Sequence, residues 1–377
     1  MKRKKQTDFR TYENYQPHKQ PLVIPKGAKI TKINAWLMRY RYYVLAGIAI
    51  TALLIGGVIY RLYSSIDYTP TVVNSAKKQP AKKFISPLTG LEVSEAESKR
   101  PVTAVMIENS PEARPQSGLK DAGVVFESVA EGGITRFMAL YQESMPSLIG
   151  PVRSVRPHFA SWVAAFDGGL AHVGGSDIPL AKLRSGQIKD LDQFFNTSSY
   201  YRTSNRAAPH NMYTSGERLQ ALNAAKKYTS STFTYWPRVK KIVPSATPNA
   251  KMIDVPVSTG LFAVHFDWDQ AGNNYLRSQG GVAHIDREGG RITPKVVIVL
   301  QVPHNVIRDS NNYSYPNVIG TGKAWIFQNG TVSEATWSKP GDKEQVLFKD
   351  TTGKQIELNP GQTWITAVKP GSPPTWQ

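Results

Sequence analysis

Cysteine is absent from all 377 residues of this chain. Its absence excludes disulfide bonds, thiol catalysis, zinc sites with cysteine ligands and a lipid anchor attached through cysteine. The seven histidines include no His-Glu-x-x-His pattern, which is the helical spacing typical of a catalytic zinc site. We therefore expect no metal ion and no cofactor.

Charge is missing from residues 42–60, nineteen consecutive positions that lie between Arg41 and Arg61. A helix of this length spans roughly 28 Å, close to the thickness of the hydrocarbon core of a bilayer. A cleaved signal peptide is the alternative interpretation. Such a peptide has a shorter apolar stretch followed by small residues, whereas Tyr60 and Tyr63 stand at the end of this one. The sequence predicts a retained transmembrane helix.

Basic residues are concentrated before this helix. Residues 1–41 carry eleven Lys and Arg against two Asp and Glu. A short basic arm stays in the cytoplasm, which places the C-terminal bulk outside the cell membrane. The net charge of +18 is mostly local: residues 1–83 hold sixteen basic and three acidic residues (+13), which leaves thirty and twenty-five (+5) for the remainder. We expect contact with the membrane and no binding of nucleic acid.

The pattern beyond residue 60 indicates a tether and two domains of an α+β protein. Residues 61–83 are mostly polar and contain two prolines. Interleaved strands and helices predict a mixed α/β first domain at 84–245, and a run of strands predicts a β-rich second domain at 246–377. The expected strands are 102–108, 123–130, 134–142, 170–173 and 295–302, with a hairpin at 323–337, and the expected helices are 158–167, 177–185 and 214–228.

The richest group of candidate ligand-binding residues lies in a loop bounded by prolines. Arg153, Ser154 and Arg156 occupy this loop, and Arg136 stands near the start of an expected strand. Guanidinium groups fixed by the backbone bind phosphate or carboxylate through paired hydrogen bonds. The alternative is ion pairing within the protein, with Glu127, Glu131 and Glu143. Both interpretations remain open at the level of sequence.

A pair of glycines follows the next expected strand. Gly174 and Gly175 lie between His172 and the dipeptide Ser176–Asp177. Backbone N–H groups beside such a pair can bind an oxyanion. Ser176 and Asp177 serve equally well as helix caps, and the pattern is weaker than a complete phosphate-binding loop. We include all four as candidate site residues.

His210 and Asn211 complete the candidate set. We expect them to orient the ligand, because they precede a capped helix on the same predicted domain. If folding brings His172, Asp177 and His210 together, these three can transfer protons and are the candidate catalytic residues. A serine hydrolase is a weaker alternative, because neither candidate serine lies in a Gly-x-Ser-x-Gly motif.

The chain resembles the YerB-like family of bacterial envelope proteins. The resemblance rests on SPLTG at 86–90, RPQSGL at 114–119, GPVRSVRP at 150–157, GGSD at 174–177, PHN at 209–211, GTGKAW at 320–325 and NPGQTW at 359–364. It implies two linked domains, mixed α/β and then β-rich, displayed outside the cytoplasmic membrane. Many family members are lipoproteins attached through cysteine, and the apolar helix would replace that anchor here. The resemblance implies no catalytic assignment.

Three functions follow from these patterns. The first is a single-pass cell-membrane protein whose extracytoplasmic part binds an anionic cell-wall polymer or a lipid-linked phosphate through its arginines. The second is a hydrolase or transferase acting on cell-wall material. The third is a non-catalytic recruiter of cell-wall machinery. Arginines that open into one cleft favour the first, whereas arginines that are all paired with glutamates favour the third.

Overall fold

The computed structural model describes residues 39–65, 83–311 and 313–377. Contacts divide the chain into two compact units, residues 1–79 and 80–377, and each is described by itself. The basic arm predicted for 1–41 lies outside the described residues except at its C-terminal end. The tether predicted for 61–83 is described only at its two ends.

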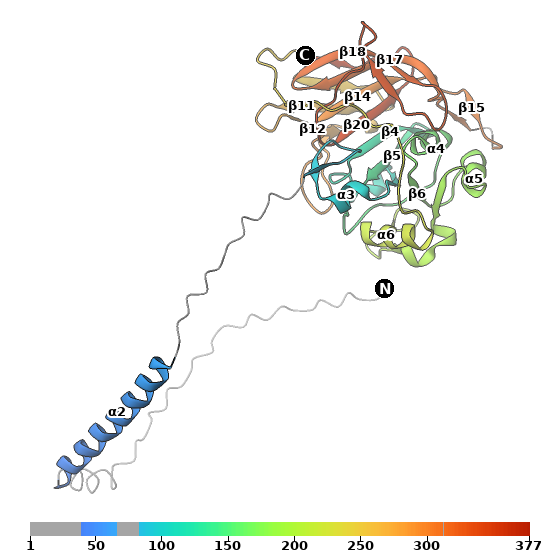
Figure 1. The fold of residues 1–377 in the computed structure, drawn as a ribbon. Coiled ribbons are helices and arrows are strands. Elements are labelled where there is room, and N and C mark those ends of the chain that lie inside the picture. The colour runs from blue at the N-terminus through green and yellow to red at the C-terminus, as the bar shows by residue number, and fades with distance from the viewer. Residues whose placement is uncertain (1–38, 66–82, 312) are drawn as a thin grey trace, which may run out of the picture. The chain divides into compact units, whose positions relative to one another are not determined.

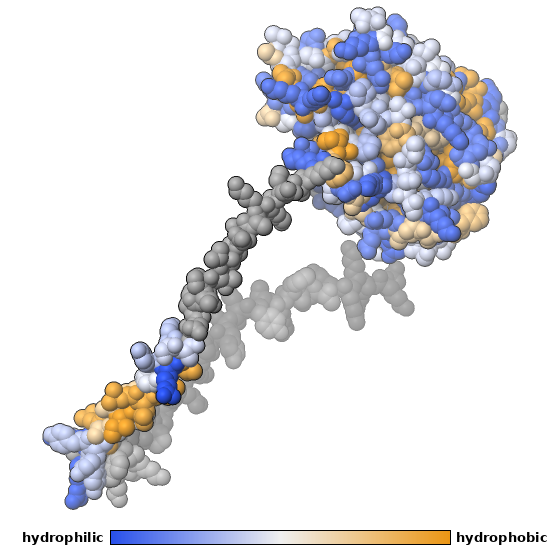
Figure 2. Space-filling view, in the orientation of Figure 1, coloured by the Kyte–Doolittle hydropathy of each residue, from blue (hydrophilic) through white to orange (hydrophobic). Residues whose placement is uncertain are grey.

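A single long helix, α2 (Arg41–Ser64), forms the described part of the first unit (Figure 1). Its 24 residues correspond to about 36 Å, and the helix is long and apolar enough to cross a membrane. None of its residues is buried, and Figure 2 shows apolar side chains around its middle. The helix contains the whole predicted span and continues for about one further turn.

A ten-stranded mixed sheet runs through the second unit in the order β19-β18-β17-β14-β20-β4-β5-β3-β6-β7. The predicted domains meet where β20 (Thr363–Val368) lies parallel to β4 (Val124–Glu131). The other strands are β3 (Thr103–Glu108), β5 (Ile134–Tyr141), β6 (Gly169–His172), β7 (Lys189–Asp192), β14 (Val296–Gln301), β17 (Gly320–Gln328), β18 (Thr331–Lys339) and β19 (Leu347–Lys349). Both predicted domains thus contribute to one sheet.

Smaller elements cover this sheet. A five-stranded sheet contains β10 (Met252–Val255), β11 (Val264–Asp269), β12 (Asn274–Gln279), β13 (Val282–Ala283) and β21 (Thr375–Trp376). Three two-stranded sheets pair β1 (Phe84–Ile85) with β2 (Glu92–Val93), β8 (Tyr201–Arg202) with β9 (Met212–Tyr213), and β15 (Ile307–Arg308) with β16 (Ser314–Tyr315). The α-helices of this unit are α3 (Glu95–Lys99), α4 (Pro157–Ala164), α5 (Asp177–Arg184) and α6 (Gly216–Ala225).

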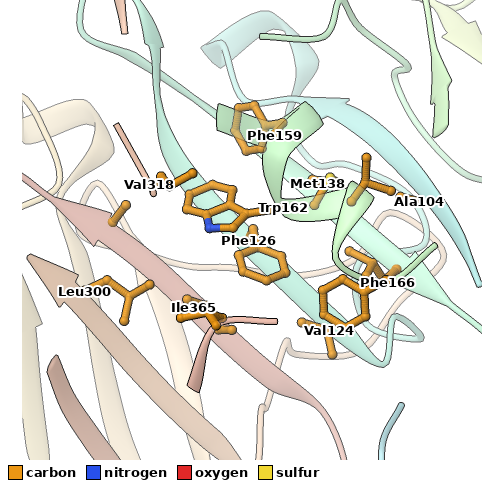
Figure 3. Close-up of a cluster of buried hydrophobic side chains, with 14 of the residues drawn as sticks. Ala104, Val124, Phe126, Met138, Phe159, Trp162, Phe166, Leu300, Val318 and Ile365 are labelled. Carbon is orange, nitrogen blue, oxygen red and sulfur yellow. The ribbon is translucent and has the colours of Figure 1, made fainter. Parts of the chain in front are cut away.

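Hydrophobic cores lie on both faces of the ten-stranded sheet. In β14, Ile298 faces one buried cluster while Val297 and Val299 face the other, because successive side chains of a strand point to opposite faces. On the face covered by α4, Trp162 stacks on Phe126 with a ring-centroid separation of 4.7 Å (Figure 3). Burial on both sides explains why the central strands are continuous apolar runs.

The predicted α+β class is confirmed, with a mixed α/β first part and a β-rich second part. The Asn329-Gly330 turn joins β17 to β18, and both residues have positive φ, as a tight hairpin turn of this kind requires. The predicted ends of the helices agree less well with the structure. Helix α4 ends at Ala164, before the predicted residue 167. Helix α6 begins at Gly216, where the Ser215 side chain accepts a hydrogen bond from the Arg218 N–H at 3.2 Å.

Candidate functional site

Three parallel strands end at one edge of the ten-stranded sheet. Strand β6 runs parallel to β3 and to β7. The last residues of these strands are Glu108, His172 and Asp192. Ligands of open α/β sheets bind outside the carboxyl ends of parallel strands. This edge is therefore the expected position of a binding site.

A cleft of about 530 Å³ opens at this edge, a volume within the range of small-molecule sites. Four of the predicted site residues line it: Arg153, Ser154, Gly174 and Gly175. They share the cleft with four residues that the sequence interpretation did not include: Arg184, Asp192, Phe194 and Phe195. The structure thus brings Arg153 and Ser154 of the arginine loop and the glycine pair together, and adds charged and aromatic groups to them.

Arg153 is the predicted arginine that reaches the cleft. Its side chain is 27% exposed, and its Nε lies 3.4 Å from Oε1 of Glu108. That separation is an ion pair without a hydrogen bond, since Arg153 Nε has no hydrogen-bond partner within the described ranges. The guanidinium charge of Arg153 is therefore only partly neutralised inside the protein and faces the cleft.

Arg136 and Arg156 both form ion pairs with the carboxylate of Glu131. This finding corrects the prediction that they bind the ligand. Arg136 Nη2 lies 3.2 Å from Glu131 Oε1, and Arg156 Nε donates to Glu131 Oε2 at 3.0 Å. Arg136 also donates to the Ser154 carbonyl at 2.7 Å. Both arginines are buried. Burial, together with the nearby charge of Arg156, lowers the pKa of Arg136 to about 10, so it remains a cation at neutral pH and serves to hold the arginine loop.

The glycine pair allows two loops to approach closely. The Gly174 N–H donates to Asp192 Oδ1 at 3.1 Å, and the Gly174 carbonyl accepts from the Val155 N–H at 3.0 Å. Gly174 has φ of +59°, and a Cβ at this position would meet the Phe194 ring at 3.1 Å. The Gly174 amide is therefore not available as a ligand donor, contrary to the prediction for this residue. The Gly175 N–H donates no hydrogen bond within the described ranges, so its role as a donor stays a prediction, and both glycines line the cleft.

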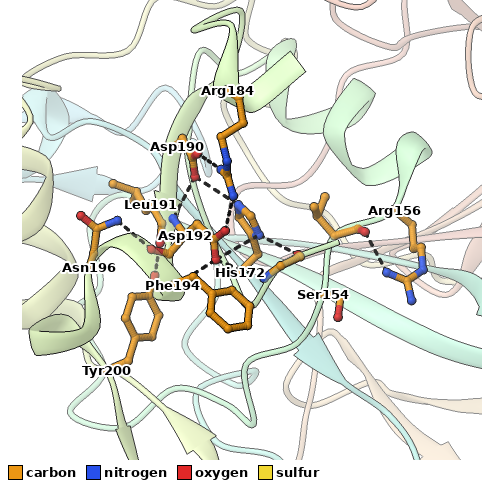
Figure 4. Close-up of polar contacts among 12 residues, drawn as sticks. Ser154, Arg156, His172, Arg184, Asp190, Leu191, Asp192, Phe194, Asn196 and Tyr200 are labelled. Atoms are coloured by element: carbon orange, nitrogen blue, oxygen red, sulfur yellow. Dashed lines mark hydrogen bonds and ion pairs between the residues drawn. The ribbon is translucent and has the colours of Figure 1, made fainter. Parts of the chain in front are cut away.

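His172 lies under the cleft in a buried polar network (Figure 4). Its Nδ1 is 2.8 Å from the Gly174 carbonyl and its Nε2 is 3.2 Å from Asp190 Oδ1. Arg184 pairs with both Asp190 and Asp192. Burial alone would raise the pKa of Asp190, but the hydrogen bond with His172 and the charge of Arg184 outweigh it and lower that pKa. This network holds the ends of β6 and β7 together.

The structure corrects the predicted catalytic trio. Asp177 is exposed at the start of α5, where its carboxylate accepts from the N–H groups of Ile178 at 2.9 Å and Ser310 at 3.0 Å. His172 is fully buried. Ser176 is buried at the N-cap of α5 and does not line the cleft. The predicted proton-transfer group of His172, Asp177 and His210 is therefore not formed.

His210 instead pairs with Glu108. Its Nδ1 lies 3.0 Å from Glu108 Oε1, and its side chain is 23% exposed. Neighbouring Asn211 braces its own loop: both of its amide protons are donated, to the carbonyls of Thr203 at 2.9 Å and Arg206 at 3.1 Å. Its carbonyl oxygen accepts from Arg202 at 2.7 Å. Asn211 is therefore a structural residue, contrary to the prediction that it orients a ligand.

A weak pattern in the sequence marks some of the cleft residues that the sequence interpretation did not include. Asp190 and Asp192 alternate along the KDLD run of β7, and two phenylalanines follow almost at once. Alternation places the two carboxylates on one side of a strand, and a strand end is a usual position for site residues. The pairing of Arg184 with both carboxylates depends on the packing of α5 and has no local sequence signal.

Comparisons with known proteins agree with this architecture. Family models described as "Protein of unknown function (DUF3048) N-terminal domain" and "C-terminal domain" match residues 88–230 and 253–365. The chain is 33% identical over 292 residues to the Bacillus subtilis (strain 168) protein described as "Putative lipoprotein YerB", across 76% of this chain and 87% of that protein. The crystal structure of YerB from Bacillus subtilis superposes with a TM-score of 0.68 and 31% identity, covering 76% of this chain and 97% of that one. The chain therefore belongs to the YerB family, with both DUF3048 domains in order.

Proposed function

We propose that this chain is a single-pass envelope protein with its N-terminus in the cytoplasm and residues 83–377 outside. The support is the apolar helix α2, the basic residues before it and the description of a relative as a lipoprotein. Because this chain has no cysteine, α2 provides the anchor in place of a lipid.

The absence of cysteine also makes the topology simple to test, because a single introduced thiol reports one position. Lys4→Cys and Lys240→Cys place it in the arm and at an exposed position of the second unit. In intact cells, a membrane-impermeant maleimide labels Lys240→Cys and leaves Lys4→Cys unlabelled until the membrane is opened. The reverse pattern would refute the orientation.

Within this protein, the cleft binds an anionic ligand, and the position of Arg153 carries this proposal. Arg153 is partly exposed, lines the cleft and has one ion pair, at 3.4 Å, within the described residues, whereas Arg136 and Arg156 are paired with Glu131. A guanidinium group beside a cleft is a preferred partner for phosphate or carboxylate. An outward-facing, membrane-anchored protein meets both groups in cell-wall polymers and lipid-linked phosphates.

The binding test uses the full chain in detergent micelles and poly(glycerol phosphate) as the probe. Arg153→Ala is expected to weaken binding by about tenfold or more, the loss expected for a charge-assisted contact. Arg218→Ala is the matched control, because it removes the same charge from an exposed position of α6 that does not line the cleft. Equal affinities for all three proteins would refute the proposal.

The pairing of His210 with Glu108 favours a second candidate, a hydrolase or transferase acting on wall material. The carboxylate holds His210 Nδ1 at 3.0 Å, and His210 Nε2 has no hydrogen-bond partner in the described part of the chain. A carboxylate on one imidazole nitrogen, with the other nitrogen open, is the arrangement of a general base. Turnover of wall material that His210→Ala abolishes without unfolding the protein would establish this activity, and its absence at every pH would exclude it.

A further inference from the structure

Two adjacent aromatic side chains that line the cleft are exposed to solvent. Phe194 is 64% exposed and Phe195 is 69% exposed, and both line the cleft. Neither ring contributes to the buried clusters on the two faces of the sheet. Exposed rings of this size leave apolar surface in water, which is a common sign of a binding surface.

The polar network fixes the backbone that carries these rings, and its Arg184 contacts the ring of Phe195. The buried Asp192 carboxylate accepts from the Phe194 N–H at 3.2 Å, and the Asp192 carbonyl accepts from Asn196 at 2.7 Å. The Arg184 guanidinium lies 4.5 Å from the centre of the Phe195 ring. Figure 4 shows Phe194 next to this network. The backbone that presents the rings is therefore preorganised, which reduces the entropy cost of binding.

We propose that the cleft binds a sugar ring that carries an anionic group. The apolar C–H face of the sugar packs on Phe194 and Phe195, and the anionic group pairs with Arg153. This inference rests on the proposed anion binding and extends it by naming the ligand class.

The composition of the cleft favours a sugar over an acyl chain. Arg153 and Ser154 bring polar groups to the same cleft as the two rings, whereas Arg184 and the fully buried Asp192 are already paired with each other. Sugar hydroxyls can hydrogen-bond with Arg153 and Ser154, whereas an acyl chain would cover these two groups without offering a polar partner, which costs free energy. The mixture of one stacking surface, one hydroxyl and one open cation thus matches an anionic sugar.

Isothermal titration of the full chain in micelles tests this inference with four probes: inorganic phosphate, N-acetylglucosamine, N-acetylglucosamine 1-phosphate and N-acetylmuramic acid. The two anionic sugars separate a phosphate-bearing ligand from a carboxylate-bearing one. We expect at least one of them to bind about tenfold more tightly than inorganic phosphate. The double variant Phe194→Ala/Phe195→Ala is expected to lose that gain while its affinity for inorganic phosphate stays unchanged.

Two further variants keep the test decisive. Phe194→Tyr/Phe195→Tyr preserves both ring faces and is expected to retain the gain. Tyr235→Ala removes an aromatic ring that is 65% exposed and does not line the cleft, so it is expected to change nothing. Anionic sugars that bind no more tightly than phosphate, or a double alanine variant that retains the gain, would overturn the sugar assignment alone. Phosphate binding that Arg153→Ala does not weaken would overturn the underlying anion site.

Discussion

The fully buried carboxylate of Glu127 accepts two hydrogen bonds from the fully buried guanidinium of Arg277, at 3.0 and 2.9 Å. Glu127 belongs to β4 in the first predicted domain and Arg277 to β12 in the second. Trp364 of β20 donates to the same carboxylate at 3.0 Å. One ion pair therefore links three strands from both sheets and both domains.

Breaking this pair is expected to destabilise the whole second unit. Glu127→Gln leaves the Arg277 charge buried without a counter-ion, and the free energy of unfolding should fall by about 3–5 kcal/mol. Chemical denaturation monitored by tryptophan fluorescence measures the change. Glu95→Ala is the control, because its exposed pair with Lys99 is worth no more than about 0.5 kcal/mol. Equal, small effects for both variants would show that the ion pair does not hold the domains together.

Arg156→Ala separates a structural arginine from a binding one. It removes one of two cations that share Glu131, so we expect the free energy of unfolding to fall by about 1–3 kcal/mol. Phosphate affinity should change less than twofold, because Arg156 does not line the cleft. Unfolding and titration measurements on the same preparation check both parts. Lost affinity with unchanged stability would assign Arg156 to the ligand instead.

Gly174→Ala and Gly186→Ala form a matched pair. Both glycines have positive φ, but a Cβ at Gly174 would meet the Phe194 ring, whereas a Cβ at Gly186 would meet nothing within 4 Å. Each substitution should cost about 1–2 kcal/mol of stability, because alanine disfavours this backbone region. Titration with N-acetylglucosamine 1-phosphate and N-acetylmuramic acid is expected to show weaker binding of the sugar for Gly174→Ala alone, since Phe194 must move, while the affinity for inorganic phosphate stays unchanged. Weakened binding in both variants would point to general loosening of the fold.

His158 makes the folded protein sensitive to acid. Both of its ring nitrogens are buried without hydrogen-bond partners among the described residues. Burial, followed by the nearby charges of His304 and Arg156, lowers the pKa of His158 well below its ordinary 6.5. The unfolded chain therefore binds a proton below pH 6.5 that the folded chain does not, and stability falls as the pH drops through that value.

His158→Phe removes this proton uptake, since phenylalanine does not titrate. Denaturation at pH 7 and pH 5 is expected to show a smaller loss of stability for the variant than for the unmodified chain. The replacement suits the site, where His158 already packs against the rings of Phe159 and Trp162. Identical pH dependence in the two proteins would show that His158 is already protonated, or not buried, in the folded state.

Much of the fold could be predicted from sequence because its central strands are buried on both faces. Runs such as VVIVL in β14 have no polar residue to confuse the pattern, and the Asn329-Gly330 turn marks its hairpin locally. The joining of both domains in one sheet could not be predicted. It depends on the pairing of β20 with β4, two segments more than two hundred residues apart that carry no signal of their partnership.

Only part of the candidate site could be predicted from the sequence, because local composition identifies a loop but not the residues that lie beside it in space. The loop that carries Arg153 and the Gly174–Gly175 pair were identified by local composition, and the cleft contains both. Whether each arginine can bind a ligand depends on which carboxylate lies beside it in space. Glu131 neutralises Arg136 and Arg156, while Glu108 lies farther from Arg153. Single-sequence patterns do not distinguish these three environments.

The most direct measurement is the side-chain NMR signal of each arginine during a titration with inorganic phosphate. The full chain is labelled with ¹⁵N-arginine, and the Nε–Hε signals of Arg136, Arg153 and Arg156 are assigned by substituting each in turn. A saturable shift of the Arg153 signal, with the Arg136 and Arg156 signals unmoved, is the predicted result. An Arg153 signal that stays fixed at saturating phosphate, or that moves no more than the signal of buried Arg156, would contradict anion binding in this cleft.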